Sequence, residues 1–470
     1  MPSLADLGST DRDGEHTVIV GAGITGLACA HRLLTNDPRA RVTVIDSRDR
    51  VGGLIRTSAF AGHPHVDEAA DAFLLRNPSA RALAEAVGLG SSLTSPATGH
   101  AFVWRGRLHK LPEGLFLGVP TKPTQLATTR LISLPGKFRA AIEPFIPRTQ
   151  LDTDCLGAYM RRRLGNEVHE ILIDPLVGSI YAADTDHFSL RGMPQLSELT
   201  SQGRSMLLTL RGRPKPPPAG PDNPVFAAPG TGMQTLVDAT HAAVTALGGV
   251  VQTGCTASTV RSAAHGLVVD FGESSIAADH VVLCAPARTT ASLLHDTAPK
   301  AAQVMAAWEH ASVVMVTLAV PKRALPRETV GSGYLVPKPN QRFVTAVSFA
   351  SQKWAHLDDG DNAILRVSLG RDGMPMHQHS DDEIISYTLA DLKLHLGVDF
   401  SPSAVRITRW VESFPQYRPG HFDRVSHVES HLARELPDVH LAGASYRGIG
   451  IPSCVEQANS VADRITRRGR

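Results

Sequence analysis

The sequence predicts an α/β protein whose first unit is a doubly wound domain built on a parallel sheet. Three observations lead to this class: a strand–helix–strand pattern near the start, a return of apolar strands and helices after residue 225, and a strand–turn–helix at the end. At 470 residues the chain exceeds one ordinary core, so two or three domains are expected.

The first elements follow from local patterns. The branched run "HTVIV" predicts a strand over 16–20, and "ITGLACAHRLLTN" predicts a helix over 24–36 with its apolar side chains on one face. Asn36-Asp37-Pro38 ends that helix, and "RVTVID" predicts a second strand over 41–46. This order is the start of a Rossmann-like βαβ unit.

The turn between this strand and helix carries the spacing G-x-G-x-x-G. Gly21 allows the tight bend, Gly23 lets a pyrophosphate approach the backbone, and Gly26 lets helix and strand pack closely. The helix N-terminus offers free N–H groups to the phosphates. Asp46, twenty-five residues after Gly21, is placed to accept hydrogen bonds from ribose hydroxyls. The alternative is a glycine-rich turn without a ligand.

Two further features favour FAD over NAD. Arg50 and the pair Gly52-Gly53 follow Asp46 and place a cation and a bare backbone beside the same ribose and pyrophosphate. Near the end, "VHLAGASYRGIGIPSC" predicts a strand, a glycine-rich turn and a helix that begins near Pro452. That helix N-terminus is expected to face the flavin ring. The alternatives are a surface arginine, a plain turn and a helix that merely packs on the sheet.

Changes in composition and in the expected secondary structure along the chain predict five segments. Residues 1–75, 221–300 and 411–470 are assigned to the FAD-binding domain, 76–220 to a mostly helical part of the substrate domain, and 301–410 to its sheet. The Pro-rich run 211–224 is expected to be an irregular connection.

Composition excludes several classes. The net charge of +2 gives no argument for nucleic-acid binding, and the five cysteines contain no C-x-x-C, which argues for a reducing compartment and against disulfides or zinc. No metal site is expected, because no H-E-x-x-H occurs, and no G-x-S-x-G nucleophile is present. The polar start and the lack of a long apolar run predict no signal peptide, no transmembrane helix and a cytoplasmic location.

Four blocks point to a known family: "DPLVGSIYAADTDHFSLRGMPQL", "FAAPGTGMQTLVDAT", "RWVESFPQYRPGH" and "LAGASYRGIGIPSCVEQA". Together with the N-terminal motif they resemble the oxygen-dependent porphyrinogen oxidases of haem synthesis, within the amine-oxidase-like FAD superfamily. The resemblance runs from about 16 to 467. It implies an FAD domain, a mixed-sheet substrate domain and an inserted, mostly helical domain that touches membranes in some members.

The resemblance also implies an activity, a six-electron oxidation of a porphyrinogen to a porphyrin with O₂ as acceptor and H₂O₂ as product. Coproporphyrinogen III is the preferred substrate, because the likeness is greatest to soluble Gram-positive-type enzymes. Protoporphyrinogen IX is the alternative, and another flavin oxidase of the superfamily, or a non-catalytic flavin-fold protein, ranks below both. Peripheral membrane contact and a downstream haem-pathway enzyme are candidate partners.

The resemblance implies a set of FAD contacts by position. They are Gly21, Ala22, Gly23, Ile24, Thr25, Gly26, Asp46, Arg50, Asp67, Glu68, Ala69, Ala70, Ala257, Trp410, Gly448, Ile449 and Gly450, to which the residue reasoning above adds Gly52 and Gly53. The chain departs from the family in three places: Ala69-Ala70 where a glycine is common, Asp46 in place of glutamate, and an inverted Ser-Gly order in "VGSIYAAD".

The catalytic side chains are left unassigned, because the flavin itself supplies the chemistry. Tyr181 is a candidate wall of the substrate slot and Tyr446 an even choice between slot and core. Arginine forks suit propionates. The candidates are Arg105, Arg107, Lys110, Arg161, Arg162 and Arg163, each with a solvated surface position as the alternative.

Overall fold

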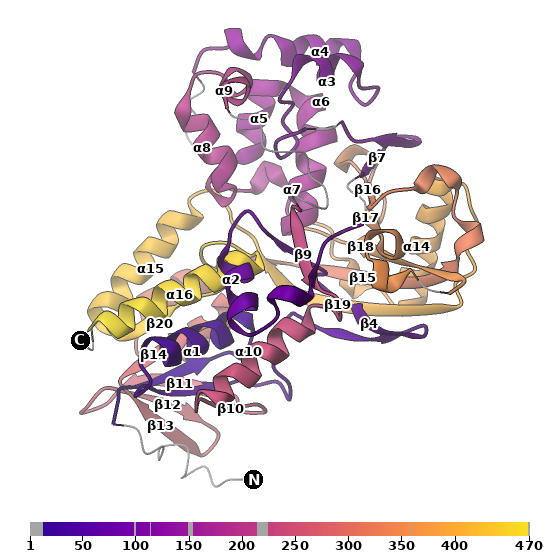
Figure 1. Ribbon diagram of the computed structural model, residues 1–470. Helices are drawn as coiled ribbons and strands as arrows, with labels where there is room; N and C mark the ends of the chain where they lie inside the picture. Colours follow the sequence, from indigo (N-terminus) through magenta and orange to yellow (C-terminus); the bar gives the residue numbers. More distant parts are fainter. Residues whose placement is uncertain are drawn as a thin grey trace.

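The structure is a computed structural model that describes residues 13–97, 100–112, 114–148, 154–213, 224–358 and 360–468. In Figure 1 an α/β part lies at the bottom, a second sheet with helix α14 lies to one side, and a group of helices stands above them. Two segments of the sequence analysis lie mostly outside the described residues. They are the polar start, of which residues 1–12 are not described, and the Pro-rich connection, of which residues 214–223 are not described.

A five-stranded parallel sheet forms the centre of the α/β part, which confirms the predicted fold class. Its order is β10-β2-β1-β14-β20. Because both faces of a parallel sheet are covered, apolar side chains of one strand point to both sides: in β1, Ile19 packs on one face while Val18 and Val20 pack on the other. The strands are β1 (His16–Val20), β2 (Arg41–Ile45), β10 (Val250–Gln252), β14 (His280–Leu283) and β20 (Val439–Leu441).

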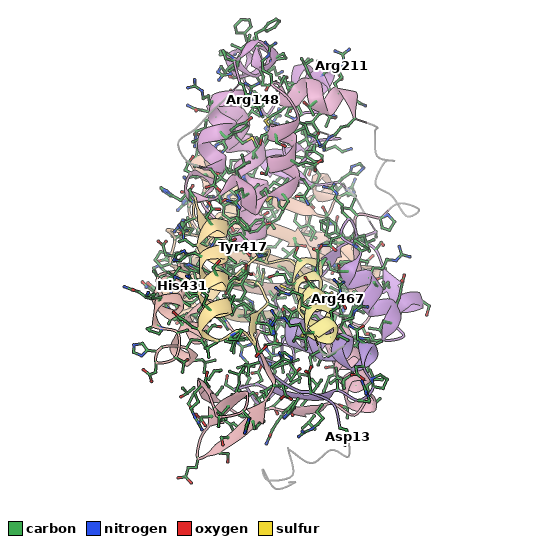
Figure 2. The ribbon with its side chains drawn as sticks, turned by 90° about the vertical axis from the view of Figure 1, so that its left-hand side faces the viewer. Asp13, Arg148, Arg211, Tyr417, His431 and Arg467 are labelled. Atoms are coloured by element: carbon green, nitrogen blue, oxygen red, sulfur yellow. The ribbon has the colours of Figure 1, made fainter. Side chains whose placement is uncertain are left out.

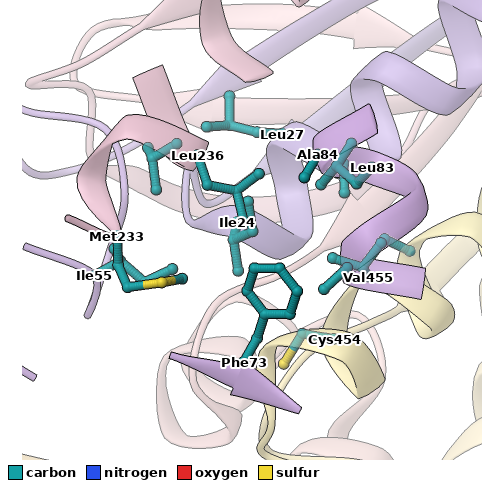
Figure 3. Packing of buried hydrophobic residues seen from close by; sticks show 14 of the residues in the cluster. Ile24, Leu27, Ile55, Phe73, Leu83, Ala84, Met233, Leu236, Cys454 and Val455 are labelled. Carbon is teal, nitrogen blue, oxygen red and sulfur yellow. The ribbon is translucent and has the colours of Figure 1, made fainter. Parts of the chain in front are cut away.

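Helices cover one face of this sheet, and a small sheet with further helices covers the other. The first face carries α1 (Ile24–Asn36), α2 (Ser79–Ala86), α10 (Gln234–Ala246) and α16 (Ile451–Arg468). Figure 3 shows how Phe73 packs among side chains of α1, α2, α10 and α16. The second face carries β11 (Ala257–Ser262), β12 (Leu267–Phe271), β13 (Ser274–Ala278), α11 (Ala287–Leu293), α12 (Pro299–Ala306) and α15 (His421–Glu435).

The second sheet is mixed, as expected for the substrate domain. In its order β19-β15-β18-β17-β16-β7-β8, β16 and β7 pair in parallel and the other pairs are antiparallel. Its strands are β7 (Phe102–Trp104), β8 (Leu108–Lys110), β15 (His310–Pro321), β16 (Gly333–Leu335), β17 (Val344–Phe349), β18 (Asn362–Leu369) and β19 (Ala404–Pro415). Helix α14 (Asp381–Leu396) packs on it, with a Ser380–Glu383 capping box at its start and Gly397 in the left-handed region at its end.

The helical part has its own apolar core. A π-helical turn over His169–Ile173 joins α6 to α7, within the segment that the sequence predicts to be mostly helical. The helices are α3 (Pro123–Thr128), α4 (Leu134–Ala141), α5 (Leu156–Leu164), α6 (Asn166–Val168), α7 (Asp174–Tyr181), α8 (Pro194–Gln202) and α9 (Met206–Gly212). Short elements connect the parts: β3 (Thr57–Phe60), β4 (His63–Asp67), β5 (Phe73–Leu74), β6 (Leu93–Thr94), β9 (Phe226–Pro229) and α13 (Ala350–Lys353).

Candidate functional site

The turn between β1 and α1 leaves an open space beside Gly23. Gly21 lies at φ +113° and donates its N–H to the Ile45 carbonyl at 2.7 Å. A Cβ on Gly26 would lie 1.9 Å from the Gly21 carbonyl oxygen, so this position demands glycine for packing. A Cβ on Gly23, in contrast, would meet only the Gly53 Cα, at 3.9 Å, within 4 Å. Gly23 therefore borders a space that the described protein atoms leave open.

This space suits a pyrophosphate. Gly23 begins α1, and among the described residues no side chain caps the helix there and no acidic residue occupies its first turn. The first N–H groups of an α-helix have no partner within the helix and attract anions. A bare backbone, free N–H donors and a positive helix end are the features that a dinucleotide phosphate needs, so the residues present fit FAD.

Gly52 and Gly53 lie directly against the turn, as the sequence predicts. Gly52 donates its N–H to the Ala22 carbonyl at 2.8 Å, and a Cβ on Gly53 would lie 3.3 Å from the Gly23 Cα. Arg50 holds this second loop. Its guanidinium donates to three backbone carbonyls, those of Val51, Gly53 and Ile55, at 2.9–3.2 Å. The arginine therefore shapes the glycine loop through its backbone.

Asp46 lies at the carboxyl end of β2, beside the same turn. Its carboxylate accepts hydrogen bonds from the backbone N–H of Ala22 at 2.7 Å and of Arg48 at 2.9 Å. A carboxylate has about four lone-pair sites, which leaves room for ribose hydroxyls. The Asp46 carbonyl accepts the N–H of Cys255 at 2.8 Å, which brings the start of β11, and with it Ala257, to this edge.

The C-terminal helix begins at the same end of the sheet as α1. Thr25 hydrogen-bonds Cys454, near the starts of the two helices, while Arg32 Nε and Asp463 lie 2.8 Å apart, further along both. The two helices therefore run parallel, side by side (Figure 1). Their N-termini lie side by side, which places Gly448, Ile449 and Gly450 next to the N-terminal turn. The sequence predicts that these two turns form the two halves of one flavin site.

Tyr417 holds the C-terminal turn in place. Its buried hydroxyl donates to the Ala444 carbonyl and accepts the N–H of Gly448 at 2.8 Å. Tyr417 lies in the "PQYRPGH" block that supports the family resemblance, but sequence reasoning gave it no role. Only the fold shows that this phenol bridges both ends of the glycine-rich turn.

Residues 67–70 come together with Trp410 on the sheet side of the site. The Trp410 indole N–H donates to the Glu68 carbonyl at 3.1 Å, and Arg366 donates to the Ala69 carbonyl. Asp67 accepts the backbone N–H of Met233 at 2.9 Å, and burial raises its pKa. The segment expected to contact FAD is thus fixed from β18, β19 and the start of α10.

Asp71 anchors this segment, and sequence reasoning missed its role. Its carboxylate lies 2.9 Å from Lys353 Nζ and 3.0 Å from Arg366 Nη1, and the Trp354 indole donates to it at 3.2 Å. Burial alone would raise the pKa of Asp71, but Lys353 and Arg366 outweigh burial and hold the pKa below its usual value. The only sequence signal was its place in "AADAF".

Tyr181 lies at the end of α7, facing the C-terminal turn. Its hydroxyl donates to the Gly192 carbonyl at 3.0 Å, its ring centroid lies 6.2 Å from that of Tyr417, and Ile449 packs on the same apolar cluster. Burial raises the pKa of Tyr181 to about 12. The side chain is therefore a neutral wall and a poor acid or base.

Tyr446 takes the core position of its two alternatives. The ring is buried against Trp308, at a centroid distance of 5.9 Å, and the hydroxyl reaches Thr290 at 3.3 Å. It lies in the cluster on the far face of the sheet, away from the slot side. Tyr446 is therefore removed from the slot candidates.

Three of the six basic candidates are held by carboxylates of the protein. Arg105 pairs with Glu167 at 2.8 Å, and Arg161 pairs with Asp186 at 2.9 Å. Arg163 is fully buried against Glu143. Their role as propionate ligands gains no support from this arrangement. Three candidates have exposed side chains: Arg107, Lys110 and Arg162.

The fold and the dinucleotide site are those of the class of FAD-binding oxidoreductases, and comparison with known proteins agrees. The sequence pattern of the flavin containing amine oxidoreductase family matches residues 24–466. The chain belongs to this family, and its cofactor is FAD.

Within the family the chain is similar to porphyrinogen oxidases over nearly its whole length. It is 33% identical to the coproporphyrinogen III oxidase of Bacillus subtilis, over 97% of this chain and 99% of that one. It is 26% identical to a chloroplastic protoporphyrinogen oxidase of Oryza sativa, over 96% of this chain and 88% of that one. A crystal structure provisionally described as a protoporphyrinogen oxidase of Exiguobacterium sp. matches with TM-score 0.84 and 27% identity, over 97% of this chain and 100% of that chain.

Within the part of the chain that the structure describes, no helix has the length and apolar character needed to cross a membrane. All five cysteines are free.

Proposed function

We propose that this protein oxidises coproporphyrinogen III to coproporphyrin III, with O₂ as the terminal acceptor and H₂O₂ as product. The observation that carries the proposal is the meeting of Tyr181, Tyr417 and Ile449, where the helical part brings an apolar wall to the flavin turn. The likeness to the Bacillus subtilis enzyme supports the choice of substrate.

The residues of the chain bind and orient, while the cofactor carries the electrons. FAD bound here would supply a hydride acceptor and electron transfer to O₂. Gly23, Gly53 and the start of α1 would hold its pyrophosphate, and the start of α16 would face the flavin. Tyr181 stays neutral and offers a flat wall that excludes water from one side of the slot. Protons from the pyrrole nitrogens go to solvent, so no strong protein base is required.

The test supplies each porphyrinogen in air to the yellow, FAD-loaded protein and follows porphyrin fluorescence together with H₂O₂. The expected result is an O₂-dependent rise, with the larger kcat/KM for coproporphyrinogen III. A larger kcat/KM for protoporphyrinogen IX would move the assignment to that substrate. No rise with either would leave another flavin oxidase activity, for which amines are the next substrates to supply.

We also propose a cytoplasmic protein that touches a membrane surface through the end of its helical part. Leu134, Phe138 and Phe145 expose 71–83% of their surface there, and the exposed Arg148 and Arg211 lie at the same end (Figure 2). Exposed apolar side chains flanked by cations suit an anionic lipid surface. Sedimentation with anionic vesicles, compared with neutral ones, tests this. A downstream haem-pathway enzyme remains a candidate partner, tested by co-sedimentation.

A further inference from the structure

Helix α15 carries two histidines one turn apart, of which His431 keeps 13% of its side-chain surface exposed. His427 and His431 occupy positions i and i+4, so their side chains are neighbours on the helix surface. Their Nε2 atoms lie 2.9 Å apart, and their ring centroids lie 4.5 Å apart. His427 is exposed, and Figure 2 shows His431 at the edge of the molecule. We propose that this pair binds a divalent transition-metal ion that takes imidazole ligands at a right angle, Cu²⁺ above all.

Kept close to its present value, the distance between the two nitrogens favours a metal ion that takes ligands at a right angle. With metal–nitrogen bonds of about 2.0–2.1 Å, nitrogens 2.9 Å apart subtend an angle of about 90° at a shared metal ion. Tetrahedral coordination would need the nitrogens about 3.4 Å apart at the same bond length. Right-angle ligands belong to tetragonal Cu²⁺ and Ni²⁺ sites, and Cu²⁺ stands highest in the affinity order.

A carboxylate one turn further along supports this use of His431. Glu435 Oε1 lies 3.8 Å from His431 Nδ1, on the side of the ring opposite the other histidine. A carboxylate beside Nδ1 favours the proton on that nitrogen, which leaves Nε2 with a free lone pair.

The ring of His427 must change tautomer when the ion binds. In the present contact one Nε2–H donates to the other Nε2, and the carboxylate at His431 makes His427 the donor. Moving that proton to Nδ1 of His427 through solvent frees its Nε2 lone pair. Imidazole χ2 torsions have broad minima, so a small rotation aims both lone pairs outward. The binding step therefore exchanges one hydrogen bond for two metal bonds.

The surroundings predict a reversible site with two protein ligands. In the described residues no third His, Cys, Asp or Glu completes a metal cluster, so water fills the remaining positions. Lys300 and Arg434 lie close enough to His431 to lower its pKa, and their positive charge opposes the ion, while Glu435 favours it. We expect affinity well below that of a closed structural site.

The test titrates Cu²⁺ into chelator-treated, FAD-loaded protein and follows binding by calorimetry and by electron paramagnetic resonance. The expected spectrum shows two equatorial nitrogens. His427→Gln and His431→Gln should each weaken the tightest binding event at least tenfold and remove the two-nitrogen signal. His265→Gln, at an exposed turn histidine, is the matched control and should change neither. Equal binding in all four proteins, or an equal loss in the control, would overturn the proposal.

A second measurement separates a metal clamp from a general loss of histidines. An ion that joins positions i and i+4 stabilises only the folded helix, so Ni²⁺ should raise the Tm of the wild-type and control proteins but not of the two variants. The rise should shrink as the pH is lowered, because protons compete with the ion for the imidazole nitrogens. A Tm rise that persists in both variants would contradict the site.

Discussion

Lys353 Nζ lies 2.9 Å from Asp71 Oδ2, and this ion pair joins α13 to the segment that follows β4. Arg366 reaches the same carboxylate from β18 and also donates to the Ala69 carbonyl. Lys353 and Arg366 therefore set the position of a backbone segment that we expect to touch the flavin. The α/β part and the second sheet are tied together beside the expected cofactor site.

Replacing Lys353 with Met should cost about 2 kcal/mol of unfolding free energy and weaken FAD retention. Removing one partner of a buried ion pair costs about 3–5 kcal/mol, and the remaining Arg366 reduces that penalty. Urea unfolding and FAD release measure the two effects. Lys322→Met is the control, because the Lys322–Asp358 pair is exposed and should contribute less than about 1 kcal/mol. Equal losses in both variants would contradict the anchoring role.

Asp71 should make stability depend on acid. Because its pKa is lower in the folded protein than in the unfolded chain, its ion pairs stabilise the fold fully above the unfolded value of about 4. That stabilisation is lost as pH falls toward the folded pKa. The difference in unfolding free energy between wild type and Asp71→Asn should therefore be largest near pH 7 and shrink below about pH 4. A difference that stays constant down to pH 3 would exclude this linkage.

Two glycines of the N-terminal turn should respond differently to substitution. Gly23→Val should fold but lose FAD, because Gly23 has an ordinary φ of −70° and the added side chain enters only the open space beside Gly53. Gly26→Val should lose the fold itself, since its Cβ would lie 1.9 Å from the Gly21 carbonyl oxygen. Circular dichroism and the flavin absorbance separate these outcomes. Full FAD content in Gly23→Val would show that the turn does not hold the pyrophosphate.

Tyr417→Phe should loosen the C-terminal flavin turn. Loss of the hydroxyl leaves the Gly448 N–H and the Ala444 carbonyl without this partner, at a cost of about 1–3 kcal/mol. FAD dissociation should become faster, as measured by flavin fluorescence after dilution. Tyr387→Phe serves as control, because Tyr387 lies on α14, its ring stacks on Phe343, and it belongs to a different apolar cluster from Tyr417. Unchanged FAD release in Tyr417→Phe would remove its positioning role.

Tyr181→Phe should leave the chemistry almost unchanged. A phenol with its pKa raised to about 12 carries no useful proton transfer at pH 7, so kcat should stay within about threefold of wild type. The lost hydrogen bond to Gly192 should cost about 1 kcal/mol. The pH profile of kcat decides the question. Loss of a titrating limb in the variant would make Tyr181 an acid or base after all.

Local patterns predicted the N-terminal unit closely. The structure has β1 at His16–Val20 and α1 at Ile24–Asn36, the bounds that the sequence indicated. Here apolar periodicity and glycine punctuation agree, and both act over a few residues. Helix α16 begins at Ile451, next to the expected start near Pro452, because proline fits the first turn of a helix.

Tertiary contacts account for what the sequence could not reveal. Helix α15 was missed although Val425, Val428 and Leu432 form a buried stripe at helical spacing, because polar residues dominate the segment. The roles of Asp71 and Tyr417 depend on partners that only the fold brings near. The ion pairs of Arg105 with Glu167 and of Arg163 with Glu143 could likewise not be predicted from the sequence, because the partners lie far apart along the chain.

The parallel pairing of α1 and α16 has a consequence for synthesis in the cell. The two helices that we expect to flank the cofactor are separated by more than four hundred residues of chain. A ribosome has therefore translated both sheets and the helical part before the second half of the expected flavin site emerges. We therefore expect FAD to bind after translation, and a nascent chain stalled before α16 should stay colourless.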